Sequence, residues 1–217
     1  MVGAAVSREE LLARGIPSER IQVLGIPIDP KFSKPLNREQ LQQRLGLDPK
    51  LFTVLICSGG FGTGPIAESV LALSKIATPL QLLVVTGKNS ALLRQLEAKQ
   101  AQIPHRLKLY GFADNMEELM TLADLMVTKP GGLSCTEAIA KGLPLLLVSP
   151  IPGQETRNAK ILIKEGIAVR VPRLQEFPKL LEQLRNDPAQ LAEMARRGKQ
   201  FSLPDAAFSI ARLALSS

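Results

Sequence analysis

The run from Lys129 to Glu137 holds the residues best suited to binding a ligand. It has the sequence Lys-Pro-Gly-Gly-Leu-Ser-Cys-Thr-Glu, follows a short apolar segment at 124–128 and precedes a helical pattern at 136–142. A strand that turns through glycines into a helix presents free backbone N–H groups and the positive end of the helix dipole, which together bind phosphate. Glu137, expected in the first helical turn, can accept hydrogen bonds from sugar hydroxyls. These features indicate a nucleotide that carries both phosphate and ribose.

The same residues also fit an interpretation without a ligand. Ser134 and Glu137 have the S-x-x-E spacing of a capping box, in which both side chains bond backbone N–H groups at the start of a helix. A loop at 152–158 has the same ambiguity. Its Gln154 and Asn158 share one helical face and can hold hydroxyls, but Gln154 and Glu155 also suit a first helical turn. Each segment alone leaves both interpretations open.

Other chemistries find less support among the residues. The Gly60-x-Gly62-x-Gly64 loop is close to the dinucleotide fingerprint, but residues 84–89 lack the acidic residue that would bind a nicotinamide cofactor's ribose. An NAD-linked oxidoreductase is therefore the weakest alternative. Cys57 and Cys135 have no metal-ligand spacing and are expected to be small buried thiols. The single histidine, His105, is expected at the surface, so neither a catalytic triad nor a histidine metal cluster is predicted.

The elements around these loops repeat an apolar strand, a turn and an amphipathic helix. Strands are expected at 52–57, 80–86, 106–110, 124–128, 144–149 and 168–172. This alternation predicts βαβ units and a parallel sheet, and the continuous apolar strands fit a sheet covered on both faces. The fold class is α/β, a doubly wound, Rossmann-like parallel sheet. A helical C-terminal extension is expected at 177–184, 188–201 and 206–215.

The first 34 residues follow a different pattern. A helix is expected at 8–14, a short strand at 21–24 and a stiff proline-rich stretch at 25–30. We interpret residues 1–34 as the tail of a preceding domain and a linker. Residues 35–217 are then the ligand-binding domain.

Composition and charge narrow the partners. The 217 residues carry 27 basic and 20 acidic side chains, a net charge of +7, and residues 157–199 hold ten of the basic against five of the acidic ones. Such a surface favours anions, but an aromatic fraction of 4% is poor for stacking bases, so an anionic membrane surface is preferred to nucleic acid. The N-terminus lacks the features of a secretion signal. We expect a cytoplasmic protein with peripheral membrane contact.

The five loops that follow the expected strands should meet. In an open parallel sheet, ligands bind outside the carboxyl ends of the strands. The loops at 59–64, 87–89, 111–115, 131–137 and 152–158 each follow such an end. The sequence therefore predicts one shared crevice formed by all five.

These motifs, in this order, resemble a known family. They are Gly59-Gly60-Phe61-Gly62-Thr63-Gly64, Gly111-Phe112-Ala113-Asp114-Asn115-Met116, Lys129-Pro130-Gly131-Gly132-Leu133-Ser134, Glu137-Ala138 with Gly142-Leu143-Pro144, and Pro152-Gly153-Gln154-Glu155 with Asn158. Together they resemble the donor-binding half of diacylglycerol glycosyltransferases of the monogalactosyldiacylglycerol synthase type. That type is similar to the bacterial enzyme that adds N-acetylglucosamine to the peptidoglycan lipid intermediate. Phe61, in place of a small residue, and Pro130-Gly131-Gly132, in place of Ala-Gly-Pro, depart from the family.

The resemblance implies a two-domain GT-B enzyme that transfers a hexose from a UDP-sugar to a lipid such as diacylglycerol. It implies that the Gly111, Phe112 and Ala113 backbone faces the uracil and that Glu137 binds the ribose. It further implies that Gly62, Thr63, Leu133 and Ser134 hold the diphosphate, that Gln154, Glu155 and Asn158 hold the sugar, and that Gly60 and Gly132 complete the donor-binding set.

The catalytic residues are not identified, because the family's base lies in an N-terminal acceptor domain that these motifs do not include. The chain is expected to be inactive without that domain or an equivalent partner subunit. No cofactor is implied, since the UDP-sugar is a substrate. No metal is implied either, since no Asp-x-Asp motif occurs. The alternative is a nucleotide-sugar-binding module without catalysis.

Overall fold

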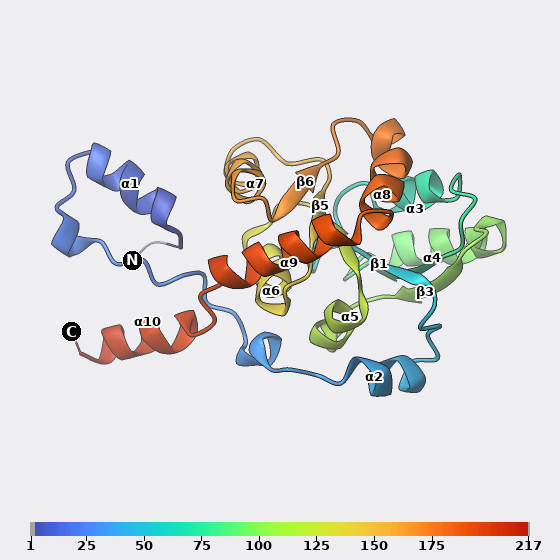
Figure 1. Cartoon of the computed structure of the whole chain (residues 1–217), viewed down its shortest axis with the longest axis horizontal. Helices are drawn as coiled ribbons and strands as arrows, with labels where there is room; N and C mark the ends of the chain where they lie inside the picture. The colour runs from blue at the N-terminus through green and yellow to red at the C-terminus, as the bar shows by residue number, and fades with distance from the viewer. Residues whose placement is uncertain (1–2, 217) are drawn as a thin grey trace.

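A computed structural model describes residues 3–216 and contains one six-stranded parallel sheet (Figure 1). The strands are β1 (Phe52–Cys57), β2 (Leu80–Val85), β3 (Arg106–Tyr110), β4 (Leu125–Thr128), β5 (Leu145–Leu147) and β6 (Ala168–Arg170). Their order across the sheet is β3-β2-β1-β4-β5-β6, and every neighbouring pair is parallel. The predicted doubly wound, Rossmann-like fold is confirmed.

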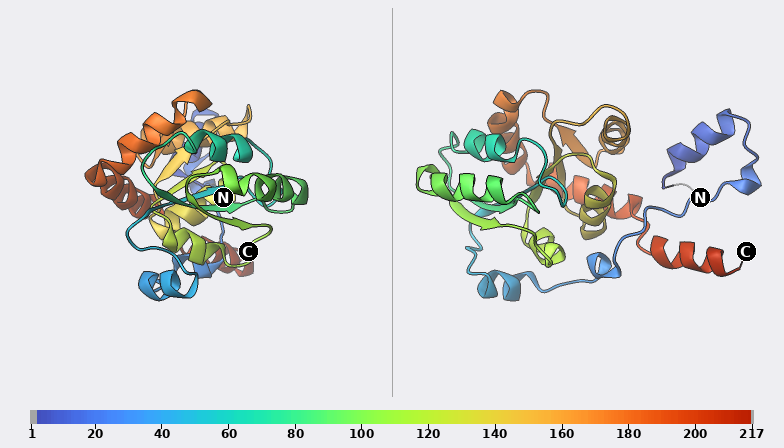
Figure 2. Two further views of the ribbon diagram at one scale, coloured as in Figure 1. Left: turned by 90° about the vertical axis from the view of Figure 1, so that its right-hand side faces the viewer. Right: turned by 180° about the vertical axis from the view of Figure 1, so that it is seen from behind.

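Helices cover both faces of the sheet, as Figure 2 shows from two sides. The α-helices are α1 (Ala5–Ala13), α2 (Arg38–Arg44), α3 (Ile66–Leu73), α4 (Ser90–Lys99), α5 (Met116–Leu122), α6 (Gly132–Lys141), α7 (Gln154–Lys164), α8 (Phe177–Arg185), α9 (Pro188–Phe201) and α10 (Ala206–Leu215). Four short 3₁₀ turns among the described residues are η1 (Ser18–Arg20), η2 (Pro30–Ser33), η3 (Gln100–Gln102) and η4 (Leu174–Glu176). Helices α3, α4 and α8 share one apolar core, and α2, α5, α6 and α7 share the other.

The strand sequences explain why both faces are covered. Successive side chains of a strand point to opposite faces. In β1, Val54 and Ile56 therefore enter the core beneath α3, whereas Leu55 and Cys57 enter the core beneath α5 and α6. All six residues of β2 are buried. A strand without a polar face can be stable only between two layers of helices.

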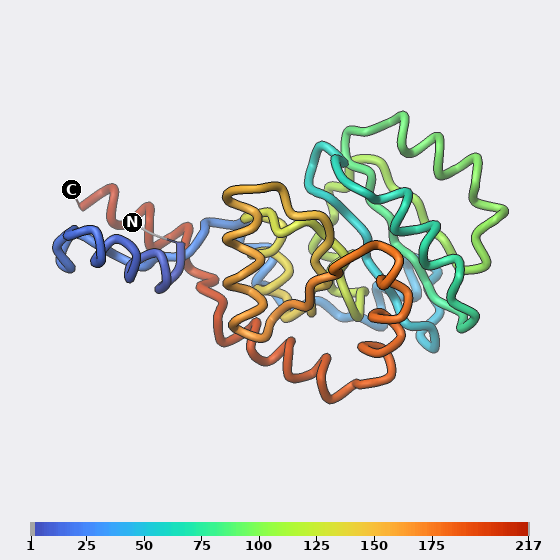
Figure 3. Tube along the Cα trace, turned by 90° about the horizontal axis from the view of Figure 1, so that it is seen from above, coloured from blue at the N-terminus to red at the C-terminus, as the bar shows by residue number. Residues whose placement is uncertain are grey.

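The helical C-terminal extension is confirmed, but its last helix leaves the body of the domain. Helix α9 packs beside α6, whereas α10 lies at the same end of the molecule as α1 (Figure 3). The two terminal segments cross at Gly25, where a Cβ would stand 2.9 Å from Leu203 Cβ and 3.0 Å from Ala206 Cβ. Within residues 3–216, no helix combines the length and apolar character needed to cross a bilayer.

Two local predictions are wrong. The short strand expected at 21–24 is reduced to a single bridged residue, Val23, outside the six-stranded sheet. His105 is buried rather than on the surface, with 8% of its area exposed. Its Nε2 lies 2.8 Å from the Leu73 carbonyl oxygen, and the Leu80 N–H donates to Nδ1 at 3.4 Å. The histidine thus joins the end of α3 to the start of β2.

Residues before 35 differ in how they pack. Helix α1 buries none of its side chains, whereas Ile28 and Phe32 belong to the core that covers α5 and α6. The second part of the expected linker is therefore fastened to the sheet domain. The domain boundary at residue 35 stays a prediction.

Candidate functional site

The five predicted loops lie along the carboxyl edge of the sheet and are joined in strand order. Between the β3 and β2 loops, the Gly87 N–H donates to the Gly111 carbonyl at 3.1 Å. Between the β2 and β1 loops, the Lys88 N–H donates to the Gly60 carbonyl at 2.9 Å. Lys129 Nζ then reaches Thr63 Oγ1 at 3.1 Å, and Asn158 Nδ2 reaches the Pro130 carbonyl at 3.0 Å. The five loops converge as predicted, and the single crevice that they were expected to form stays a prediction.

The loop after β1 depends on glycine because it presses against its neighbours. Gly62 has φ +61°, and a Cβ there would collide with the Thr86 carbonyl of the β2 loop. A Cβ on Gly64 would stand 2.7 Å from Ser58 Oγ. Ser58 in turn donates its hydroxyl to the Thr63 carbonyl. The loop after β1 therefore has no side chain at Gly62 or Gly64, the residues on both sides of Thr63.

Helix α6 begins earlier than the sequence predicts. It starts at Gly132 rather than Thr136, with Gly131 as the N-cap residue and no side-chain cap. Ser134 is consequently inside the helix, so the capping-box interpretation is wrong, and Glu137 lies in the second turn rather than the first. The backbone N–H groups of Gly132, Leu133 and Ser134 lack helical partners and face outward from the helix start. An uncapped N-terminus of this kind attracts anions.

Glu137 combines partial burial with a lack of partners. Among the described residues, its carboxylate makes no hydrogen bond and no ion pair. Burial raises the pKa of Glu137, while the nearby charge of Lys31 lowers it and that of Asp29 raises it further. A half-buried carboxylate without a donor is costly, and a ligand with hydroxyl groups would supply the missing donors.

Helix α7 supplies the third group of predicted residues. It begins at Gln154, after Gly153 with φ +102°, so Gln154 and Glu155 lie in the first helical turn. Gln154 is exposed, and its Nε2 would stand 4.0 Å from a Cβ on Gly132, so these two predicted residues are neighbours. Asn158, by contrast, already uses its amide to bond the Pro130 carbonyl.

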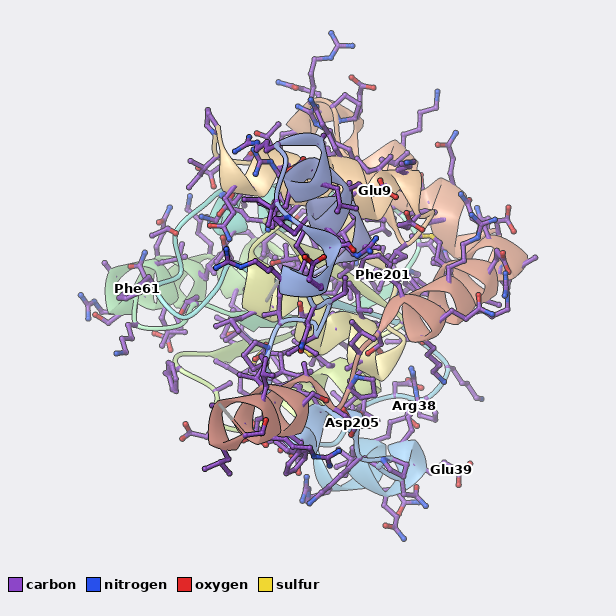
Figure 4. All side chains as sticks on the ribbon, turned by 90° about the vertical axis from the view of Figure 1, so that its left-hand side faces the viewer. Glu9, Arg38, Glu39, Phe61, Phe201 and Asp205 are labelled. Carbon is purple, nitrogen blue, oxygen red and sulfur yellow. The ribbon has the colours of Figure 1, made fainter. Side chains whose placement is uncertain are left out.

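Exposed apolar side chains border the same edge. Phe61, Phe112 and Leu133 expose 75%, 60% and 59% of their area. Figure 4 shows Phe61 at the periphery of the molecule, and Lys88 Nζ lies 5.9 Å from the centre of its ring. A Cβ on Gly60 would stand 3.8 Å from the Phe112 ring. Ala113 is partly buried against the core.

Lys129 opens the predicted run, where the sequence favours a surface salt bridge over a helping role at the diphosphate, and its burial was not predicted. Its side chain is only 11% exposed, and it lies between Thr63 and Glu155. A lysine directly after a buried strand and before a glycine turn was a usable signal for this position. Lys31 is a second such residue, since it pairs with Glu117 at 3.0 Å and donates to the Asp114 carbonyl at 2.9 Å. No local pattern marks Lys31, because these contacts join distant segments.

Hollows in the structure lie next to this edge and opposite it. A cavity of about 120 Å³ borders the start of α6 and is lined by Gly25, Gly132, Cys135 and Asn158, among others. A larger hollow of about 1250 Å³ lies at the amino edge of the sheet. Within residues 3–216, no three His, Cys, Asp or Glu side chains are close enough together to hold a metal ion.

Fold and site together define a Rossmann-like domain with an anion-attracting edge of glycine loops and a half-buried carboxylate, Glu137, that no described residue pairs. The chain belongs to glycosyltransferase family 28. Its residues 53–210 match the "Glycosyltransferase family 28 C-terminal domain". The doubly wound sheet is accordingly one half of a GT-B fold.

Three known proteins illustrate the relationship. The chain is 33% identical over 196 residues to the processive diacylglycerol beta-glucosyltransferase of Bacillus licheniformis, covering 90% of this chain and 51% of that protein. It is 33% identical over 210 residues to monogalactosyldiacylglycerol synthase 3, chloroplastic, of Arabidopsis thaliana, covering 93% and 45%. The crystal structure of Acinetobacter baumannii MurG superposes with a TM-score of 0.68 at 24% identity, covering 86% and 55%. The chain thus spans about half the length of the curated relatives it matches.

Proposed function

We propose that this chain binds a UDP-sugar at the carboxyl edge of its sheet and supplies the donor site for transfer of a hexose to a lipid hydroxyl. The observation that supports the proposal most is the placement of Glu137. A half-buried carboxylate that no described residue pairs lies one turn into a helix with an uncapped N-terminus, and Lys129, just before that helix, bonds Thr63 of the glycine loop. Phosphate at the helix start and ribose hydroxyls at Glu137 would satisfy both groups.

The remaining predicted residues fit roles around that pair. We assign the diphosphate to the backbone of Gly62, Leu133 and Ser134 with the Thr63 hydroxyl, and the uracil to the backbone of the β3 loop. When the bond to the anomeric carbon breaks, its electron pair goes to the diphosphate. Backbone N–H groups and the α6 dipole stabilise that developing charge without a metal or a cofactor.

Ligand binding tests the donor site directly. We expect UDP at millimolar concentration to raise the melting temperature of the chain, with calorimetry against UDP- and GDP-sugars identifying the preferred donor. Glu137→Ala should weaken UDP binding about tenfold or more, because the ribose loses a charged acceptor. EDTA should leave UDP binding unchanged. The donor site would be refuted if the chain did not bind UDP, or if it bound NAD and UDP did not compete with that binding.

The acceptor is proposed from the relatives' names. The Bacillus and Arabidopsis proteins are named for diacylglycerol, and each is about twice as long as the part it shares with this chain. We therefore propose diacylglycerol or a similar lipid as acceptor, bound by a second domain or a partner subunit that also supplies the catalytic base.

A chimera separates the transferase from a module that only binds nucleotide-sugars. We expect the chain alone to bind UDP without transferring sugar. Fused to the amino-terminal half of the Bacillus licheniformis relative, it should transfer hexose to diacylglycerol in mixed vesicles. The same fusion carrying Glu137→Ala is the matched control. Tight UDP binding with no transfer by the folded fusion would favour the binding module.

We also propose peripheral contact with an anionic membrane surface on the cytoplasmic side. The hollow at the amino edge is lined by Lys34, Lys50, Lys141, Arg185 and Lys199, none of which forms an ion pair with a described residue. Arg38, on α2 at its border, is neutralised by Asp124 at 2.7 Å, while Glu39 has no ion-pair partner there (Figure 4). Several unpaired cations beside apolar side chains suit lipid phosphates.

Vesicle sedimentation tests this contact. The chain should sediment with phosphatidylglycerol-containing vesicles and not with phosphatidylcholine alone. Combining Lys34→Ala, Lys50→Ala and Lys199→Ala should weaken the partition about tenfold or more. Lys75→Ala, Lys164→Ala and Lys179→Ala remove the same charge from exposed sites elsewhere and serve as control. Equal losses in both triple variants would mean that net charge, not this hollow, attracts the membrane.

A further inference from the structure

Lys129 is a nearly buried cation inside the proposed diphosphate site. Its side chain is 11% exposed, and its stem lies along the glycine loop, where a Cβ on Gly64 would stand 3.3 Å from Lys129 Cδ. Burying an ammonium group costs several kcal/mol unless partners compensate. The position of Lys129 therefore calls for negative charge and hydrogen-bond acceptors around Nζ.

The protein supplies only part of what Lys129 needs. An ammonium group has three donors. One bonds Thr63 Oγ1 at 3.1 Å, while the nearest Glu155 oxygen is 3.7 Å from Nζ, beyond hydrogen-bond distance. Within the described residues, two of the three donors thus lack an acceptor, and they lie beside the one side-chain hydroxyl assigned to the diphosphate.

Glu155 is committed to the protein at both of its oxygens. Oε2 accepts the Ile151 N–H at 2.9 Å, and Oε1 faces Lys129. Its side chain is 20% exposed. Gln154, one residue earlier, is exposed and makes no such contact among the described residues. The two neighbours therefore differ: Gln154 is available to a sugar, and Glu155 is held against the lysine.

Resting on the proposed function, we infer that Lys129 is the cation that meets the diphosphate, and that Glu155 positions Lys129 rather than binding the sugar. Without a ligand, Glu155 balances the charge of Lys129 at a distance that leaves two donors unused. The diphosphate oxygens accept those donors, and the lysine offsets charge on the leaving group. Lys88, the other lysine near the site, is exposed and lies over the Phe61 ring instead.

Calorimetry with UDP and uridine tests the role of Lys129. Lys129→Met should weaken UDP binding roughly 10- to 100-fold, the usual effect of losing a charged hydrogen bond, while uridine binding at millimolar concentration stays the same. Lys129→Arg should lose less UDP affinity than Lys129→Met, because it keeps the positive charge although its guanidinium has another donor geometry. Lys164→Met, at the exposed end of α7, is the matched control and should change neither ligand. If Lys129→Met does not fold, Lys129→Gln replaces it.

A second comparison isolates Glu155. Glu155→Gln should weaken UDP and UDP-glucose by the same factor, because the displaced lysine affects only the phosphates. If Glu155 bound the sugar, Glu155→Gln would instead weaken UDP-glucose binding and leave UDP affinity unchanged. That result would overturn the assignment of Glu155. Unchanged UDP affinity in Lys129→Met would overturn the assignment of Lys129 while leaving the donor site intact. Absence of UDP binding by the unmodified chain would refute the proposed function itself.

Discussion

Glu137 shows how a single residue trades stability for binding. Its carboxylate is partly desolvated in the folded chain and no described residue donates a hydrogen bond to it, so folding raises its pKa above the ordinary value of 4.5. A raised carboxyl pKa means that the unfolded chain ionises more readily than the folded one. Stability is therefore lost as pH rises through the window that begins near the unfolded pKa and ends at the folded one.

Replacing this carboxylate should expose the trade-off. We expect Glu137→Gln to melt about 1–4 °C higher than the unmodified chain at pH 7.5, since the amide has no charge to desolvate. The difference should shrink as the pH is lowered below 4.5, where the carboxyl is protonated in both states. UDP affinity should fall in the same variant. Scanning calorimetry from pH 4 to 8 measures the effect, and a melting difference independent of pH would contradict it.

Residue types alone explained some of these side chains but not others. The glycines and Glu137 were visible because turns and helix starts have local patterns. The burial of Lys129 and His105 was not, because their partners Thr63 and Leu73 are far away in sequence. Cys57 and Cys135 were predicted as buried thiols, which is confirmed. Burial raises the pKa of Cys57 to about 12, so it is not a nucleophile at neutral pH.

Among the elements, strands were easier to predict than helix starts. Continuous apolar runs mark β1, β2 and β5, and the order of turns and helices sets the parallel topology. The start of α6 was misplaced because Gly131 and Gly132 carry no side chain that distinguishes a loop from a first helical turn. The prediction of a strand at 21–24 was wrong because a strand needs a neighbour to pair with. Apolar character alone does not show whether the fold provides one.

The β1 and β2 loops offer a test at the scale of elements. Gly62→Ala should lower stability and abolish UDP binding, because its methyl group collides with the Thr86 carbonyl and separates the two loops. Gly46→Ala is a matched control with almost the same backbone: its φ is +59°, and its Cβ would have nothing closer than Lys108 Nζ at 3.8 Å.

Gly46→Ala should therefore cost only the backbone strain, about 1–2 kcal/mol, and leave UDP binding unchanged. Chemical denaturation and UDP calorimetry compare the two variants. Equal losses of stability with intact UDP binding in both would show that the loop contact does not shape the site.

At the scale of the whole molecule, α10 presents apolar side chains without a cover. It buries only Ala206, while Phe208 and Leu215 expose 57% and 90% of their area. Exposed apolar side chains gathered on one helix are typical of surfaces that contact another protein or a membrane. This fits the proposed acceptor domain, and it lies at the end of the molecule that also carries α1 (Figure 3).

Removing that apolar surface should affect assembly and not donor binding. We expect Phe208→Ser with Leu215→Ser to leave the UDP affinity unchanged and to reduce binding of a hydrophobic dye. In the chimera, the same pair should lower hexose transfer. Ile163→Ser, at a 40% exposed site on α7, is the control. Loss of UDP affinity in the double variant would show that α10 supports the donor site instead.

Two segments of the chain leave the sheet domain side by side, in contact at Gly25 and Leu203. A domain attached through one segment can rotate about several axes. A domain attached through two segments in contact can rotate freely about one axis only, in a hinge motion. A domain joined to both segments is therefore expected to rotate mainly about the contact between Gly25 and Leu203. Because Gly25 has φ +89° and no room for a methyl group, it is the residue of this contact that tolerates substitution least.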